Sequence, residues 1–128
     1  MPASIYSLQR VIASTMEAIA SKTTTFNGTA FDTLDFEGDV QLDQNVGVVS
    51  GTTPTLDGKF QESDTSGGTY TDITGATYTQ VTATTNLQTK VVRIGETKRF
   101  IRYVGTIGGT TPNFTMGVVF RGRKKYEA

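Results

Sequence analysis

Cysteine, histidine and tryptophan are all absent from this chain of 128 residues. Without Cys and His, the chain has no Ser-His-Asp or Cys-His nucleophile system, no zinc site of the His/Cys type, no redox thiol and no imidazole to carry protons near neutral pH. Carboxylates remain as candidate catalytic groups, but a two-carboxylate glycosidase also needs a sugar-binding cleft, and such clefts rely heavily on Trp. The sequence therefore predicts a protein that is not an enzyme and uses no cofactor or metal.

Long apolar runs are missing as well. No segment approaches about 18 consecutive apolar residues, and the first 22 residues, MPASIYSLQRVIASTMEAIASK, lack the charged region and apolar core of a signal peptide. We therefore expect a protein that is made in the cytoplasm and does not enter a membrane.

The abundant residues favour β-structure. The chain has 24 Thr, 11 Val and 7 Ile but only five Leu, and the first three residue types are typical of pleated, half-buried strands. A chain of this length can bury about two thirds of its unfolded surface in one core, which is enough to fold without disulfides or metal. We expect one mostly β domain.

Residues 1–22 differ from the rest because their apolar residues have helical spacing. The residues that recur at intervals of three or four are Ile5, Leu8, Ile12, Met16 and Ile19. Two interpretations fit this segment: a short helix that covers the open end of a sandwich, or an extended arm that docks on another molecule. Residues 23–128 then form a single β-sandwich domain.

The clearest strand pattern runs from residue 34 to residue 43. Apolar or small residues at even positions alternate with acidic or polar residues at odd positions, which include Asp35, Glu37 and Asp39. Such a strand buries one face and holds its carboxylates in solvent or against a cationic partner. Neighbouring carboxylates lie about 7 Å apart along a strand, a spacing that suits neither an acid/base pair nor a calcium loop.

Two strands are predicted near the C-terminus, at residues 99–107 and 114–121, joined as an antiparallel hairpin by residues 108–113. If Ile107 faces Phe114, one face of the hairpin is wholly apolar. That face carries Ile101, Tyr103, Ile107, Phe114, Met116, Val118 and Phe120. The opposite face gathers four cations for which the acidic strand is the obvious counterpart, and these are Lys98, Arg102, Arg121 and Arg123. With about seven to nine short strands in total, the sequence predicts an all-β fold, an antiparallel β-sandwich of jelly-roll or related Greek-key type.

The zero net charge is the sum of two opposed parts. Residues 1–88 carry ten acidic and three basic groups, whereas residues 89–128 carry nine basic and two acidic groups. These charges can neutralise each other within one subunit, or the basic face of one copy can meet the acidic face of another. The basic residues 121–126 are also a candidate nucleic-acid contact, but dedicated nucleic-acid domains are usually basic overall, so we expect no such partner.

Five short motifs follow one another between residues 27 and 112. They are Asn27-Gly28-Thr29-Ala30-Phe31-Asp32, Phe60-Gln61-Glu62-Ser63-Asp64, Gly68-Thr69-Tyr70-Thr71-Asp72-Ile73, Lys98-Arg99-Phe100-Ile101-Arg102-Tyr103-Val104 and Gly108-Gly109-Thr110-Thr111-Pro112. In this order they resemble a family of small virion proteins of tailed bacteriophages, in which a strand ending in QESD leads through a turn into a strand similar to TWTDV. The resemblance covers roughly residues 23–125. Tyr70 stands where the family pattern has Trp, and the N-terminal segment has no counterpart.

The resemblance implies a capsid decoration, or cement, protein with a small jelly-roll fold. Such proteins sit on the outer capsid surface of the virion, often as trimers, and clamp adjacent subunits of the major capsid protein. For this chain the resemblance implies a structural protein that forms a homotrimer and binds the major capsid protein. Composition alone does not select the capsid, because a tail, connector or fibre-associated virion protein shares these features.

Two sets of residues are candidate partner contacts. The apolar residues Ile5, Leu8 and Ile12 are the first candidates for contact with the shell or a neighbouring copy. The charged candidates are Lys98, Arg102, Arg121 and Arg123, with Asp35, Glu37 and Asp39 on the acidic strand. A function of another class, a carbohydrate-binding sandwich on the virion surface, would use Tyr70 and Tyr78 as its exposed platform.

Overall fold

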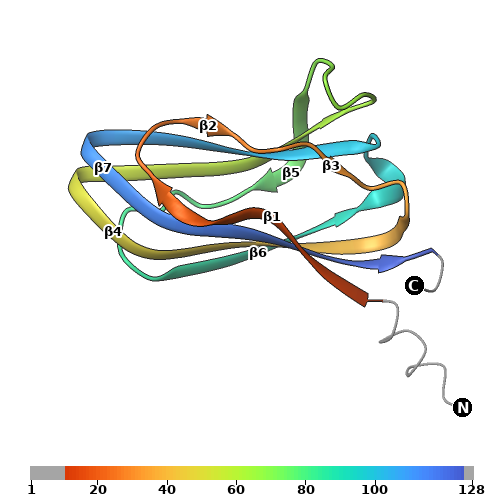
Figure 1. Ribbon diagram of the computed structural model, residues 1–128, viewed down its shortest axis with the longest axis horizontal. Coiled ribbons are helices and arrows are strands. Elements are labelled where there is room, and N and C mark those ends of the chain that lie inside the picture. Colours follow the sequence, from red (N-terminus) through yellow and green to blue (C-terminus); the bar gives the residue numbers. More distant parts are fainter. Residues whose placement is uncertain (1–10, 126–128) are drawn as a thin grey trace, which may run out of the picture.

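The computed structural model describes residues 11–125 of the chain. Within this range seven strands form one antiparallel sheet that folds over onto itself to make a sandwich (Figure 1). The strands are β1 (Val11–Lys22), β2 (Phe26–Asn27), β3 (Phe31–Asp32), β4 (Phe36–Ser63), β5 (Thr71–Thr77), β6 (Asn86–Arg93) and β7 (Phe100–Lys124), and one turn of 3-10 helix, η1, spans Ile94–Glu96. The prediction of an all-β antiparallel sandwich is confirmed.

The long strands β4 and β7 form the frame of the molecule. They pair with each other from Phe36 opposite Lys124 to Ser63 opposite Phe100, and the two-stranded ribbon bends over midway (Figure 1). The bend divides the sheet into two layers. In the first layer β1 and β6 flank residues 113–124 of β7 and 36–50 of β4. In the second layer β2, β3 and β5 flank residues 100–108 of β7 and 55–63 of β4.

The bend is built from one tetrapeptide, Gly-Thr-Thr-Pro, that occurs at residues 51–54 and again at 109–112. Its two glycines both have φ of 110°, and the third residues, Thr53 and Thr111, have φ of 47° and 46°. A Cβ atom on Gly51 would lie 2.6 Å from the carbonyl oxygen of Thr111, and one on Gly109 would lie 2.7 Å from that of Thr53. The two tetrapeptides therefore cross each other with approximate two-fold symmetry, and we call this paired corner the crease.

The core lies between the layers and is rich in aromatic rings. The ring centroid of Phe120 is 4.4 Å from that of Phe31 and 4.7 Å from that of Phe36, while Phe60 and Tyr103 are 5.6 Å apart. Six of the seven residues predicted to share an apolar face are buried, and these are Ile101, Tyr103, Phe114, Met116, Val118 and Phe120. The seventh, Ile107, is partly buried against the same cluster.

Two tyrosine hydroxyls donate hydrogen bonds inside this core. Tyr103 donates a hydrogen bond to Oε1 of the fully buried Gln44, and Tyr78 donates one to the carbonyl oxygen of Leu42. Burial raises the pKa of both tyrosines above the ordinary value, so both stay neutral donors. Because a buried donor or acceptor without a partner is costly, these contacts restrict how the two layers pack.

The predicted C-terminal hairpin is wrong. Residues 99–107 and 114–121 belong almost entirely to the single strand β7, and its two halves lie in opposite layers, where each half pairs with β4. The connection at residues 108–113 contains one half of the crease, which folds β7 over from one layer into the other, so its two halves do not pair with each other (Figure 1). Side chains of the two halves still face each other, but across the core of the sandwich.

The helical interpretation of the N-terminal segment is wrong for residues 11–22, which form β1. This strand pairs antiparallel with β7, from Val11 opposite Arg123 to Lys22 opposite Phe114. Ile12 and Met16 both pack against the core, because residues four apart lie on the same face of a strand as well as of a helix. Two register shifts after Thr15 change which face of the strand the later residues occupy. Ile5 and Leu8 lie outside the described residues.

Candidate contact surfaces

The outer surfaces of the two layers differ in chemistry. We call the outer surface of the layer with β1 and β6 the β6 face, and that of the layer with β2, β3 and β5 the β5 face. Four of the six large hydrophobic residues that are exposed within residues 11–125 lie on β1 or β6. They are Val11, Ile19, Leu87 and Val91, with exposed fractions of 48%, 73%, 68% and 63%.

The β5 face is covered by polar side chains that bond to one another. Nε2 of Gln61 donates to Asp72 (2.9 Å), and the guanidinium of Arg102 donates twice to Oε1 of Gln61 (3.0 and 2.8 Å). The same guanidinium stacks 4.1 Å from the ring centroid of Tyr70, and Lys59 pairs with Asp72 at 3.0 Å. Hydrogen bonds from Gln61 and Lys59 lower the pKa of Asp72. This face satisfies its own polar groups and suits contact with water.

The β6 face combines exposed apolar side chains with two shallow hollows. One hollow, of about 280 Å³, lies beside Ile19 and Val119, and the other, of about 300 Å³, lies between Val11 and Val91. Ile19 extends over the strand β7, where a Cβ atom on Gly117 would lie 2.8 Å from its side chain. Soluble monomeric proteins rarely leave a large apolar surface in water, so an exposed apolar surface often marks an interaction site.

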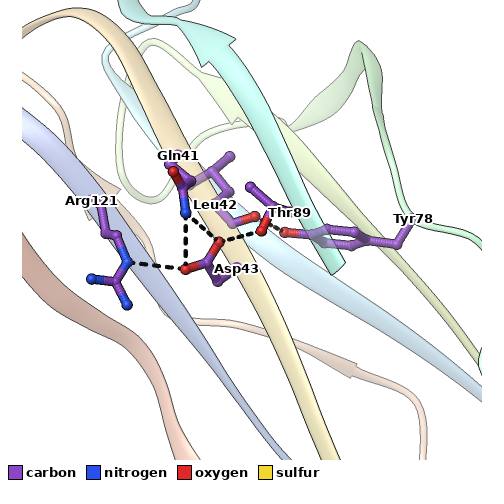
Figure 2. A network of polar contacts seen from close by, with 6 residues as sticks. All are labelled: Gln41, Leu42, Asp43, Tyr78, Thr89 and Arg121. Carbon is purple, nitrogen blue, oxygen red and sulfur yellow. Dashed lines mark hydrogen bonds and ion pairs between the residues drawn. The ribbon is translucent and has the colours of Figure 1, made fainter. Parts of the chain in front are cut away.

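A nearly buried carboxylate, that of Asp43 on β4, forms a network of polar contacts in the layer that carries the β6 face (Figure 2). Asp43 stands between Val119 of β7 and Thr89 of β6 in the sheet, and its residue is 7% exposed. Desolvation by itself raises the pKa of Asp43, but hydrogen bonds from Thr89 (2.7 Å), Gln41 (3.0 Å) and Arg121 (3.0 Å) outweigh it and hold the pKa below the usual value. The cluster ties three strands together and stays ionised at neutral pH.

Ion pairs within the subunit cancel part of the charge separation along the sequence. Four cations of residues 89–128 pair with carboxylates of residues 1–88. The pairs are Arg93–Asp39 (3.4 Å), Lys98–Asp64 (3.9 Å), Arg99–Asp32 (2.8 Å) and Arg121–Asp43 (3.0 Å). The Arg99 guanidinium, which donates two hydrogen bonds to Asp32, lowers the pKa of that carboxyl. Neutralisation within one subunit is thus the better interpretation for these residues.

The predicted gathering of four cations on one face is wrong. Arg102 lies on the β5 face, whereas Arg121 and Arg123 belong to the half of β7 in the other layer, and Lys98 precedes β7. The bend of β7 at the crease separates them. The acidic candidates are also divided, since Asp35 is exposed before β4, Glu37 stands opposite Arg123, and Asp39 pairs with Arg93.

Ile12 and the tyrosine platform also differ from expectation. Ile12 is partly buried and packs against the core, so only part of its side chain is exposed to a partner. Tyr78 is 3% exposed, and the ring of Tyr70 is stacked under Arg102 while its hydroxyl donates to the carbonyl oxygen of Ser66 (2.8 Å). The pair therefore forms no open platform for a sugar.

The exposed apolar residues that sequence reasoning missed are Leu87 and Val91. The sequence holds a signal for them, because Leu87, Thr89 and Val91 alternate with the polar residues Gln88 and Lys90. Ile19 was noted only for its helical spacing. Among residues 11–125 there is no group of three or more acidic side chains placed to hold a metal ion. No helix in this range is long and apolar enough to cross a membrane.

Comparison with known proteins adds no identification. No protein-family model matches the sequence, and no curated protein matches it significantly.

Proposed function

We propose that the protein is a structural component of a tailed-bacteriophage particle, a decoration protein that binds the outer surface of the capsid lattice and stabilises the shell. Its partner in this proposal is the major capsid protein, and its location is the virion exterior. The motif resemblance between residues 27 and 112 suggests this class of protein.

One observation carries the proposal, and it is the difference between the two outer faces. The β5 face pairs its own charged and amide groups, while the β6 face leaves Val11, Ile19, Leu87 and Val91 largely exposed. A sandwich that lies flat on a larger protein surface needs one apolar side and one side suited to water. We assign the β6 face to the shell side.

Stabilisation follows from binding alone. A module that binds the assembled lattice better than free subunits shifts the equilibrium toward the lattice by its binding free energy at each site. If one module contacts two adjacent capsid subunits, the second contact forms at high effective concentration. No chemical step is needed, which agrees with the residue types that the chain lacks.

Reconstitution on phage particles that lack the protein tests this function. Purified protein is added to such particles, and bound protein is located by cryo-electron microscopy and measured by co-sedimentation. We expect density on the outer shell with the β6 face toward the capsid. Density confined to the tail or the portal vertex contradicts the proposal, as does failure to bind.

Ile19→Lys tests which face makes the contact. Ile19 is 73% exposed, so the substitution leaves folding intact, but it places a charge in the proposed interface. Loss of a buried Ile side chain is worth about 1.5–3 kcal/mol, so we expect binding to weaken roughly tenfold or more. Leu34→Lys is the matched control, because Leu34 is 52% exposed in the turn between β3 and β4 and does not lie on the β6 face. Equal binding by the two variants contradicts the assignment of the face.

A further inference from the structure

Strand β6 is an unusually regular sheet edge. It pairs with β4 through eight consecutive residue pairs without a register shift, and within residues 11–125 its other side has no strand partner (Figure 1). The opposite edge of the same layer, β1, is interrupted by two register shifts. In the other layer β5 is shifted as well, and β2 and β3 have two residues each. Natural proteins protect edges with bulges, prolines or short strands, because a long regular edge pairs readily with another chain. β6 has neither a bulge nor a proline and is eight residues long, so its charged residues Lys90 and Arg93 are the one protection that it carries.

The side chains of β6 are self-complementary about Thr89. Residues 87–91, Leu-Gln-Thr-Lys-Val, have the same polarity when counted in either direction from the central Thr. In an antiparallel pair centred on Thr89, each Leu87 lies directly opposite Val91 of the second strand, and the two Thr89 residues face each other. These two apolar pairs would cover side chains that are 68% and 63% exposed in the single chain. Cross-strand pairs of this kind are the unit of sheet stabilisation.

The charge of Lys90 favours this register over the neighbouring registers. A pair centred on Lys90 would place two ammonium groups opposite each other, which is unfavourable. With Thr89 at the centre, Lys90 lies opposite Gln88, whose side chain carries no charge, and no two like charges are directly opposed. A register centred on Val91 would leave Leu87 without an apolar partner.

We propose that two copies of this chain associate through their β6 strands, antiparallel about a two-fold axis at Thr89. The two layers that contain β6 then form one continuous eight-stranded sheet, and both β6 faces point to the same side. A dimer of this kind differs from the trimer that the family resemblance implies. The proposal does not depend on shell binding, because it concerns the isolated protein in solution.

Molar mass in solution tests the dimer directly. Sedimentation velocity of the full chain, from low to high micromolar concentration, should show a reversible monomer–dimer equilibrium. In the Leu87→Lys, Val91→Lys double variant, two lysine pairs oppose each other across the axis, and we expect the dissociation constant to rise about tenfold or more. Both positions are exposed, so the midpoint of thermal unfolding should not change at concentrations low enough for the wild-type protein to be monomeric. Val48→Lys, at a similarly exposed site on β4, should leave the equilibrium as it is.

A single cysteine tests the position of the axis. The chain has no Cys, so Thr89→Cys introduces one thiol, and two such thiols on the axis come from directly opposed residues with Cα atoms about 4.5–5.5 Å apart. That spacing allows a disulfide, and mild oxidation should give a covalent dimer, whereas Val48→Cys should stay monomeric in the same gel. The proposal is overturned by a trimer, by a monomer at every concentration together with no cross-link at position 89, or by a dimer that the double lysine variant leaves intact.

Discussion

Substitution of either crease glycine by alanine should destabilise the protein strongly. Gly51 and Gly109 both have φ of 110°, a backbone conformation that residues with a side chain adopt only at a cost of about 1–3 kcal/mol. The new methyl group would also lie 2.6 Å (at Gly51) or 2.7 Å (at Gly109) from a carbonyl oxygen, and 2.9 Å from a proline Cα on the opposite tetrapeptide. Both atoms belong to backbone, so neither can rotate away.

These two effects add to an expected loss of about 3 kcal/mol for Gly51→Ala. For a chain of this length such a loss lowers the midpoint of thermal unfolding by about 10 °C. Because the crease is nearly symmetric, Gly109→Ala should cost the same within about 0.5 kcal/mol. The free energy of unfolding is measured by urea titration, with thermal unfolding as the second readout.

Gly67→Ala is the control for these variants. Gly67 lies in the turn between β4 and β5, and no atom comes within 4 Å of the position that its Cβ would take. We expect a change of less than about 1 kcal/mol in either direction. If Gly51→Ala is as stable as Gly67→Ala, the expected strain at the crease is refuted. If the two crease variants differ in free energy of unfolding by more than about 1 kcal/mol, the symmetry of the crease is refuted.

Two further substitutions test the polar contacts. Asp43→Asn removes a carboxylate whose pKa is lowered in the folded state, and it should cost about 2 kcal/mol at pH 7. Since the unfolded carboxyl titrates near 3.9, the stability from this charge is present above that pH and is lost as the pH falls through the lower folded pKa. The difference in free energy of unfolding between wild type and variant, measured by urea titration, should therefore be smaller at about pH 3 than at pH 7. A difference that does not change with pH contradicts this reasoning. Tyr103→Phe leaves Oε1 of buried Gln44 without its donor and should cost about 1–3 kcal/mol, whereas Tyr70→Phe, which alters an exposed contact, should cost little; equal losses contradict this reasoning.

The fold class could be predicted because strand signals are local. The alternation of Phe36, Val40 and Leu42 with polar residues depends only on the period of a strand, and all three are buried as expected. The same logic identified the core-facing residues of β7 in both of its halves. Leu34 broke the alternation, since it lies in the turn before β4 and is 52% exposed.

The connection of the strands was harder to predict because it depends on a contact between distant residues. Residues 108–113 alone read as a hairpin loop, and nothing local shows that they bend one strand across residues 51–54. The signal that would have helped is the repeated Gly-Thr-Thr-Pro, in which two identical unusual turns suggest a pair. Without that pairing, Arg102 and Arg121 were placed on one face, whereas the bend puts them on opposite sides of the sandwich.

The candidate surface was predicted in part for a related reason. Charged residues attract attention in a sequence, but Arg121, Arg93 and Lys98 are satisfied by acidic residues far away along the chain. Exposure of an apolar side chain depends on which strands flank it, and that is set by the tertiary fold. The alternation of Leu87 and Val91 with polar residues shows that they share one face of a strand, but only the tertiary fold determines that this face is exposed.

The pairing of β4 with β7 also determines the order in which the chain can fold. Their innermost pair, Ser63 with Phe100, encloses residues 64–99, and every later pair along the ribbon encloses a longer segment up to Phe36 with Lys124. Closing the first loop carries most of the entropic cost, because each doubling of loop length adds only about 0.6 kcal/mol. We therefore expect β4 and β7 to pair first at Ser63 and Phe100, and then pair by pair through the crease to Phe36 and Lys124. Strand β1 pairs with β7 last. Such non-local pairing places folding on a timescale of milliseconds to seconds.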